Sequence, residues 1–261
     1  MGTISKALAL LDTLSLMEED AGLTEIAQAC SLDKATTRRF LVELERHGFV
    51  EQLPQSRKYR IGSAPVRLGR IREARYPFLR TAAPFVRQLA DLVDETVHLS
   101  EFSGGRLSTV HVEECTRAHR VFVAVGVVLP FHATASGLAF ISSCPAEDVE
   151  AALRAPLPRY TDHTPREPDA FRRAIEETRV NGFSVNRQGY EAGVISVSAA
   201  IGAPGSPPIG CVTIAAPLVR TGEEKIRSHG QSAIETAKRI SDTFFGADLR
   251  KQAAPLSRRS A

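Results

Sequence analysis

The chain has 261 residues, of which 43% are hydrophobic and 24% are charged, with a formal net charge of +3. This length predicts two domains, and the composition is that of a globular protein with buried cores. No apolar run approaches the ~20 residues that a membrane-spanning helix requires. The first residues lack the layout of a signal peptide, so we expect a cytoplasmic protein with no membrane partner.

Positive charge is concentrated in one short segment. Residues 34–80 contain twelve Lys and Arg against four Asp and Glu, whereas residues 1–33 contain one against six and residues 81–261 contain twenty of each. A basic segment of this kind is typical of a surface that contacts a polyanion such as DNA. The cysteines are widely spaced, which argues against a disulfide framework or a zinc site; they are Cys30, Cys115, Cys144 and Cys211.

Three helices followed by a hairpin are predicted at the N-terminus. Apolar residues at helical spacing predict helices over 5–17, 24–30 and 34–47, with Thr24 as the N-cap of the second and Gly48 ending the third. The period then changes, and strands are predicted over 49–53 and 58–62. This order is typical of a winged helix-turn-helix.

The third predicted helix has an apolar face and a basic face. On a helical wheel, Thr37, Phe40, Leu41 and Leu44 fall in the sector that faces the core. The opposite side holds small and basic residues, which suit the major groove because Arg can bind guanine or phosphate. The alternative is a solvated helix in which Arg39 pairs with Glu43. The residues predicted to contact DNA from this helix and the wing are Lys34, Thr36, Arg38, Arg39, Arg46, Arg57 and Lys58.

Helices and strands alternate in the rest of the chain. A linker helix is predicted over 64–75, and further helices over 77–94, 135–143, 146–153, 169–181 and 223–245. Strands are predicted over 96–102, 108–114, 121–128, 183–185, 194–201 and 209–215. The mixture predicts an α+β fold in which helices back a sheet. The expected domains are residues 1–75 and 76–247, followed by a disordered tail over 248–261.

Several segments, taken in order, resemble a known family. They are residues 4–8 (Ile-Ser-Lys-Ala-Leu), 23–27 (Leu-Thr-Glu-Ile-Ala), 34–39 (Lys-Ala-Thr-Thr-Arg-Arg), 44–50 (Leu-Glu-Arg-His-Gly-Phe-Val) and 129–137 (Leu-Pro-Phe-His-Ala-Thr-Ala-Ser-Gly). Together they resemble the IclR family of bacterial transcriptional regulators over about residues 3–246. The resemblance implies a GAF- or PAS-like effector domain with a central antiparallel sheet, which binds a small metabolite, commonly an organic acid. It also implies homodimers and homotetramers that bind double-stranded operator DNA and repress a catabolic operon.

The loop over residues 133–137 is the expected ligand site. Its small residues lead into a helix, and free N–H groups at a helix N-terminus bind carboxylates. The family resemblance places Ala135 and Ser136 there and Asn186, Ser196, Thr213 and Ala215 on facing strands; His132 completes the predicted set. Several family members have an acidic residue and a cysteine where this chain has Asn186 and Ser196, so a hydroxy acid, a semialdehyde and an aromatic acid all remain as ligands. A Ser136 that only caps its helix is the alternative.

The sequence predicts no catalytic residue, cofactor or metal site. The segment around Ser136 lacks the first glycine of Gly-x-Ser-x-Gly, and no glycine-rich phosphate loop is present. One alternative function is a hydrolase or metal-binding sensor that uses the region of His132 and Ser136, where His98, His111 and His119 also fall. A DNA-binding architectural protein without an effector is the other.

Overall fold

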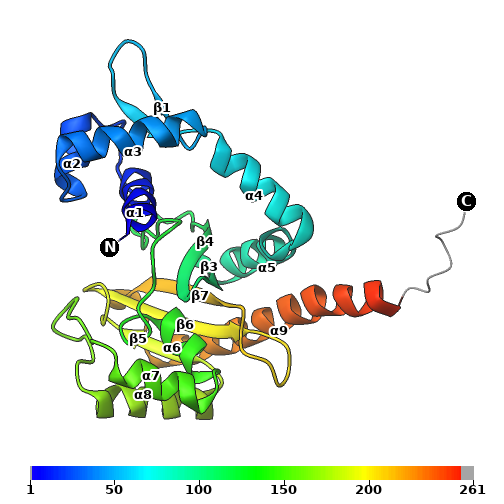
Figure 1. The fold of residues 1–261 in the computed structure, drawn as a ribbon. Coiled ribbons are helices and arrows are strands. Elements are labelled where there is room, and N and C mark those ends of the chain that lie inside the picture. The colour runs from blue at the N-terminus through cyan, green and yellow to red at the C-terminus, as the bar shows by residue number, and fades with distance from the viewer. Residues whose placement is uncertain (1, 254–261) are drawn as a thin grey trace, which may run out of the picture. The chain divides into compact units, whose positions relative to one another are not determined.

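The computed structural model describes residues 2–253, which form two compact units divided between Pro77 and Phe78 (Figure 1). Each unit has its own hydrophobic core, so each is described separately. Among the described residues, no helix combines the length and apolar character needed to cross a bilayer.

The N-terminal unit is the predicted winged helix-turn-helix. Its helices are α1 (Thr3–Ser15), α2 (Leu23–Ala29), α3 (Lys34–Arg46) and α4 (Ala64–Arg75), and its wing is the antiparallel pair β1 (Val50–Gln52) and β2 (Tyr59–Ile61). Its core brings together residues from α1, the segment before α2, α2, α3 and both strands, namely Leu10, Leu14, Ala21, Ile26, Phe40, Leu41, Val50 and Tyr59. The burial of this set explains why the helical period of the sequence located all three first helices.

Two local features of this unit concern glycines. Gly48 follows His47, the C-cap of α3, and adopts φ +73°, the left-handed conformation common just after a helix. The prediction that Thr24 caps α2 is wrong, because α2 begins at Leu23 and Gly22 is its N-cap. Gly22 has no side chain to cap the helix, but Glu25 supplies the other half of a capping box by accepting a 2.7 Å hydrogen bond from the Gly22 N–H.

The C-terminal unit contains a five-stranded antiparallel sheet in the order β4-β3-β7-β6-β5. The strands are β3 (Thr96–Ser103), β4 (Arg106–Glu113), β5 (Ser184–Arg187), β6 (Val194–Ile201) and β7 (Gly210–Pro217), followed by the short 3-10 helix η1 (Leu218–Arg220). This arrangement confirms the predicted α+β class and the central antiparallel sheet.

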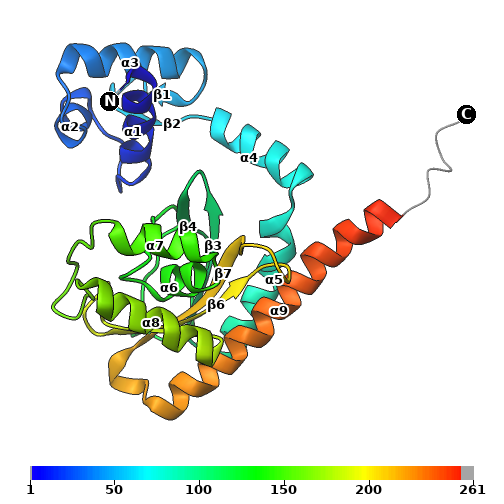
Figure 2. The ribbon, with the colours of Figure 1, turned by 60° about the horizontal axis from the view of Figure 1, so that its bottom comes forward.

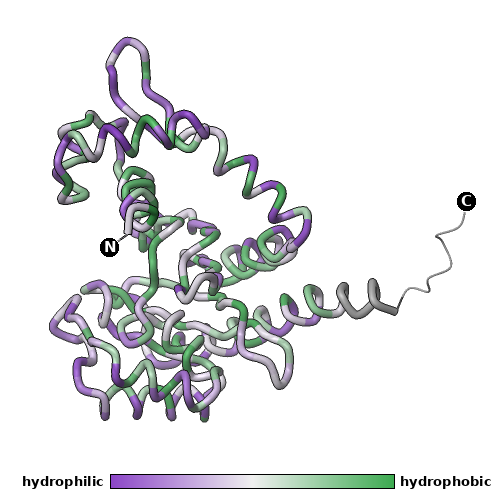
Figure 3. Tube along the Cα trace, viewed as in Figure 1, coloured by the Kyte–Doolittle hydropathy of each residue, from purple (hydrophilic) through white to green (hydrophobic). Residues whose placement is uncertain are grey.

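Helices cover both faces of this sheet (Figure 2). Helices α5 (Phe78–Val93) and α9 (Glu223–Ala253) pack on each other and on the sheet. Helices α6 (Ala135–Ser142), α7 (Ala146–Arg154) and α8 (Pro168–Asn181) pack together, and α6 lies on β5, β6 and β7. Purple and green positions alternate along α8 in Figure 3, as expected for a helix with one solvated face, whereas every residue of α6 is buried.

The segment over residues 121–128 does not form the predicted strand. It makes an isolated bridge from Val128 to Ser108, together with hydrogen bonds of 2.8 and 3.0 Å between Thr109 and the main chain of Gly126 and Val127. Gly126 has φ +90°, which interrupts extended pairing. The apolar side chains that suggested a strand instead line a cavity.

The chain ends differ from the prediction as well. Helix α9 continues to Ala253, so residues 248–253 are helical rather than part of a disordered tail. The remainder of that predicted tail lies outside the described residues.

Candidate functional site

Helix α3 is anchored by its capping residue and its buried side. Asp33 caps the helix by accepting a 2.7 Å hydrogen bond from the Thr36 N–H, which also lowers the pKa of the Asp33 carboxyl. Thr37, Phe40 and Leu41 are buried and Leu44 is half-buried, as the helical wheel predicts. The opposite side of α3 therefore remains available to a partner.

The opposite side of α3 carries exposed basic side chains with small residues between them. Lys34, Arg38, Arg39 and Arg46 are exposed and Thr36 is half-buried. A surface hollow on this side is also lined by Ala35 and Val42. Small and apolar residues between arginines permit a close approach to base edges, and Val42 suits contact with a thymine methyl group.

The alternative pairing of Arg39 with Glu43 is not found within residues 2–253. Glu43 pairs with Arg46 at 3.8 Å, while the Arg39 guanidinium lies 5.6 Å from the ring centre of Phe40. Exposed pairs of this kind contribute little to stability, so neither contact prevents the arginines from binding phosphate.

The wing presents two further cations. Arg57 is exposed in the left-handed region with φ +59°, and Lys58 beside it is half-buried. Arg60 on β2 is engaged differently, since its guanidinium pairs with the Glu51 carboxylate on β1. Arg57 and Lys58 are therefore better placed than Arg60 to attract a phosphate.

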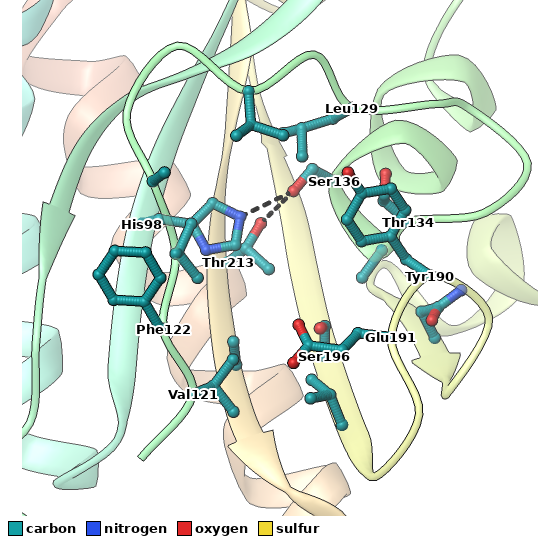
Figure 4. A pocket seen from close by; sticks show the side chains of 17 residues that line it. His98, Val121, Phe122, Leu129, Thr134, Ser136, Tyr190, Glu191, Ser196 and Thr213 are labelled. Carbon is teal, nitrogen blue, oxygen red and sulfur yellow. Dashed lines mark hydrogen bonds between the residues drawn. The ribbon is translucent and has the colours of Figure 1, made fainter. Parts of the chain in front are cut away.

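A cavity of about 240 Å³ lies in the C-terminal unit at the start of α6 (Figure 4). One wall is the irregular segment over 121–127, and another consists of side chains from β3, β6 and β7. Among the described residues that line it, Glu191 is the one with a carboxyl side chain. The complete lining is His98, Val121, Phe122, Val123, Ala124, Val127, Leu129, Thr134, Ala135, Ser136, Asn186, Tyr190, Glu191, Val194, Ser196, Thr213 and Ala215.

The start of α6 offers two unused main-chain donors to this cavity. Thr134 is the N-cap and accepts a 3.0 Å hydrogen bond from the Gly137 N–H. In the described part of the chain, the N–H groups of Ala135 and Ser136 have no acceptor. Free N–H groups at a helix N-terminus form a favourable seat for a carboxylate.

Ser136 belongs to a chain of polar side chains at this end of the cavity. Its hydroxyl lies 2.8 Å from the Thr213 hydroxyl and 3.2 Å from Nε2 of His98. Thr213 is in turn 2.7 Å from the hydroxyl of Ser198. Thr134 rather than Ser136 caps the helix, and the Ser136 hydroxyl instead connects α6 to β7 and β3.

His98 is a cavity residue that sequence reasoning did not identify. It lies on β3, is only 5% exposed, and its Nδ1 has no hydrogen-bond partner among the described residues. Burial lowers the pKa of the imidazole to about 4, so the ring is neutral at physiological pH. Residues on both faces of β3 are buried, so no alternation of polar and apolar residues indicates which way the side chain points.

Asn186 lines the cavity, but its amide is occupied by main-chain groups. Its Nδ2 donates to the Ala133 carbonyl at 2.9 Å, and its Oδ1 accepts from the Gly189 N–H at 2.9 Å. Asn186 thus joins the loop before α6 to the loop after β5. Ser196 and Ala215 are direct cross-strand partners on β6 and β7, and both line the cavity.

His132 is not brought to this cavity. Its Nε2 lies 2.9 Å from the Pro158 carbonyl, and its ring packs near Tyr160 and Phe171. Ser136 instead contacts His98, whose Nδ1 lacks the carboxylate that would orient a catalytic base. Within residues 2–253 no three His, Cys, Asp or Glu side chains are grouped to hold a metal ion. The alternative hydrolase or metal sensor thus receives no support from this geometry.

Comparisons with known proteins match both units. The model of the IclR helix-turn-helix domain matches residues 3–54, and that of the bacterial transcriptional regulator IclR C-terminal domain matches residues 74–242. The transcriptional repressor IclR of Escherichia coli (strain K12) is 26% identical, over 94% of this chain and 90% of that protein. The glycerol operon regulatory protein of Streptomyces coelicolor is 29% identical, over 94% of this chain and 96% of that protein. A crystal structure described as an IclR-type transcriptional regulator from Silicibacter sp. TM1040 has a TM-score of 0.81 at 33% sequence identity. The match covers 93% of this chain and 96% of that chain.

Proposed function

Since the chain belongs to the IclR family of bacterial transcriptional regulators, we propose that it represses an operon by binding operator DNA and is released by a small organic acid. The exposed basic side of α3 would enter the major groove, and the wing would contact phosphates. The observation that carries the DNA half of this proposal is the exposure of Lys34, Arg38, Arg39 and Arg46 on one side of a capped helix.

The cavity at the start of α6 supports the ligand half of the proposal. It combines apolar walls with two free main-chain donors, and its polar end is formed by Ser136 and Thr213. The volume of about 240 Å³ suits a ligand of on the order of ten non-hydrogen atoms, given ~30 Å³ for each water-sized group. A carboxylate would lie against the α6 N-terminus and the rest of the molecule against the apolar walls. The proposal assigns no reaction to the protein.

Self-association is part of the proposal. The N-terminal unit exposes large apolar side chains on two helices, Ile4 and Leu8 on α1 and Val66, Leu68 and Ile71 on α4. Burial of such side chains in a homodimer would place two recognition helices on one operator, with a tetramer as the larger assembly. Sedimentation velocity at micromolar concentration tests this, and a monomer at all concentrations would contradict it. As a regulator of chromosomal genes, the protein would act in the bacterial cytoplasm.

The experiment that tests the DNA half is a fluorescence anisotropy titration of DNA from upstream of the gene, repeated across a salt series. We expect tight binding whose logarithm falls linearly with the logarithm of salt concentration. The double variant Arg38→Ala/Arg39→Ala should lose specific binding, while Arg60→Gln, at a wing residue already paired with Glu51, serves as the control. Equal binding by the wild type and the double variant would contradict the proposed interface.

A further inference from the structure

The polar chain at the cavity has one direction in which every one of its contacts is a hydrogen bond. The Ser198 hydroxyl lies 3.1 Å from the Val212 carbonyl and 2.7 Å from the Thr213 hydroxyl. A hydroxyl has one hydrogen and a carbonyl only accepts, so in this direction Ser198 donates to Val212. Thr213 must then donate to Ser198. By the same reasoning Ser136 donates to Thr213 across 2.8 Å.

This direction determines the tautomer of His98. Because the single Ser136 hydrogen is used on Thr213, the 3.2 Å contact between Ser136 and His98 requires Nε2–H of the imidazole as the donor. The opposite direction would place the hydrogen on Nδ1, where a buried N–H would have no acceptor among the described residues. Buried N–H groups without a partner are rarer than under-satisfied acceptors, which favours the Nε2–H form.

Nδ1 of His98 is therefore a bare acceptor next to the cavity. Burial keeps the ring neutral, with its pKa lowered to about 4. The atom is sealed from solvent and has no partner among the described residues, which is an unfavourable state that a ligand can relieve. Figure 4 shows the ring between Ser136 and Phe122, with all three residues lining the cavity.

We propose that the effector is a hydroxy acid whose hydroxyl group donates a hydrogen bond to Nδ1 of His98. This inference depends on the proposed function, in which the carboxylate of the same ligand lies against the start of α6. An oxo acid or a semialdehyde would present a carbonyl oxygen there, and two acceptors would face each other without a hydrogen between them.

Access to Nδ1 requires a movement of the cavity wall. Residues 121–124 have neither helix nor strand pairing, and Phe122 is 72% exposed. The Val121 carbonyl in this segment accepts a 2.7 Å hydrogen bond from the Thr96 hydroxyl. A shift of this segment would admit the ligand hydroxyl to the imidazole while the strands stay in place.

The tautomer is tested by nitrogen-15 NMR of the full-length protein labelled at histidine. We expect the two-bond correlations of His98 to show a protonated Nε2 and an unprotonated Nδ1. His98→Gln identifies the signal, and the corresponding change at His111, a half-buried histidine paired with Glu113 outside the cavity, is the matched control. A protonated Nδ1 in the unliganded protein would overturn the proposal.

The ligand class is tested by calorimetry with butyrate, with 2-, 3- and 4-hydroxybutyrate, and with the corresponding oxo acids. We expect at least one hydroxy acid to bind about tenfold more tightly than butyrate and its oxo counterpart, the preference that one hydrogen bond provides. His98→Gln keeps a donor for Ser136 but removes the acceptor at Nδ1, so this preference should disappear. His98→Asn, which places an oxygen near the Nδ1 position, should retain part of it.

The outcomes separate the two proposals. Binding of all the acids with equal affinity, unchanged in His98→Gln, would overturn the hydroxy-acid inference and leave the carboxylate site intact. Absence of binding by every acid at millimolar concentration would contradict the carboxylate site itself.

Discussion

The hydroxyl of Ser136, in the first turn of α6, lies 2.8 Å from the hydroxyl of Thr213 on β7, and both side chains are 1% exposed. The contact joins positions 77 residues apart in the sequence. It holds the helix that would bind a carboxylate against the central sheet, so we expect occupation of the cavity to affect the packing of α6.

This contact predicts an energetic coupling between the two residues. Ser136→Ala and Thr213→Val should each lower the free energy of unfolding by about 1–3 kcal/mol, because each leaves buried polar partners without a hydrogen bond. In the double variant the loss should be smaller than the sum, by on the order of 1 kcal/mol. Urea denaturation of the four proteins measures this. Strict additivity would show that the hydroxyls do not interact.

Gly137 is predicted to be irreplaceable by alanine. A Cβ at this position would collide with the backbone of Pro130 and Phe131, which approaches the first turn of α6 at that point. Because backbone cannot yield as a side chain does, Gly137→Ala should destabilise the C-terminal unit by several kcal/mol, on the order of other overpacking changes or more. Gly222→Ala, where no atom lies within 4 Å of the added Cβ, is the control. Thermal unfolding followed by circular dichroism distinguishes them, and equal midpoints for both variants would refute the prediction.

Asn186 is predicted to act by positioning the cavity loops. Asn186→Ala removes the hydrogen bonds to Ala133 and Gly189 and should lower the free energy of unfolding by about 1–3 kcal/mol. Asn186→Asp should be destabilising too, because its carboxylate cannot donate to the Ala133 carbonyl. Ligand affinity should fall in both, as the loop before α6 loses its anchor. Unchanged stability accompanied by lost ligand affinity would indicate a direct contact with the ligand instead.

Stability should depend on pH through His98. The pKa of its imidazole is about 4 in the folded protein, against an ordinary value of 6.5, because burial disfavours the charged ring. Between these values the unfolded chain binds a proton that the folded chain does not, so stability is lost as pH falls from 6.5 toward 4. By pH 4 this protonation of His98 in the unfolded chain should have lowered the free energy of unfolding by about 3 kcal/mol.

The measurement for this prediction is urea denaturation at a series of pH values for wild type and His98→Gln. The variant should lose less stability over this window, and the difference between the two curves isolates His98 from other groups such as His229, whose pKa burial also lowers. Parallel curves would mean that the imidazole titrates alike in both states.

The sequence predicted those parts of the molecule in which periodicity and burial coincide. Helix α3 buries one side, and its buried residues Thr37, Phe40 and Leu41 recur at helical spacing in the sequence. The basic residues lie on the opposite side, so their exposure could be predicted from the same pattern. Residues 121–128 have the apolar composition of a strand. However, most of their side chains line a cavity, and their main chain pairs with β4 only near Ser108 and Thr109. Composition does not distinguish these two forms of burial.

The lining of the candidate cavity was predicted in outline only. The small residues around Ser136 and the loop leading into a helix pointed to the start of α6, and Asn186, Ser196 and Thr213 do line one cavity with it. His132 was predicted to belong to the same site, yet its ring turns toward Pro158. His98 was missed because its contact with Ser136 spans 38 residues and depends on the register of β3 against β7.

The central claim is that occupation of the cavity controls the affinity for DNA. The most direct measurement is the anisotropy titration of operator DNA with and without the acid that binds most tightly in calorimetry. We predict that the acid weakens DNA binding by about 10–100-fold, which requires 1.4–2.8 kcal/mol of differential binding, and that DNA weakens acid binding by the same factor. In Ser196→Phe, whose ring would fill the cavity, the acid should have no effect on DNA binding. An acid that saturates the cavity and leaves the DNA affinity of the wild type unchanged would contradict the account.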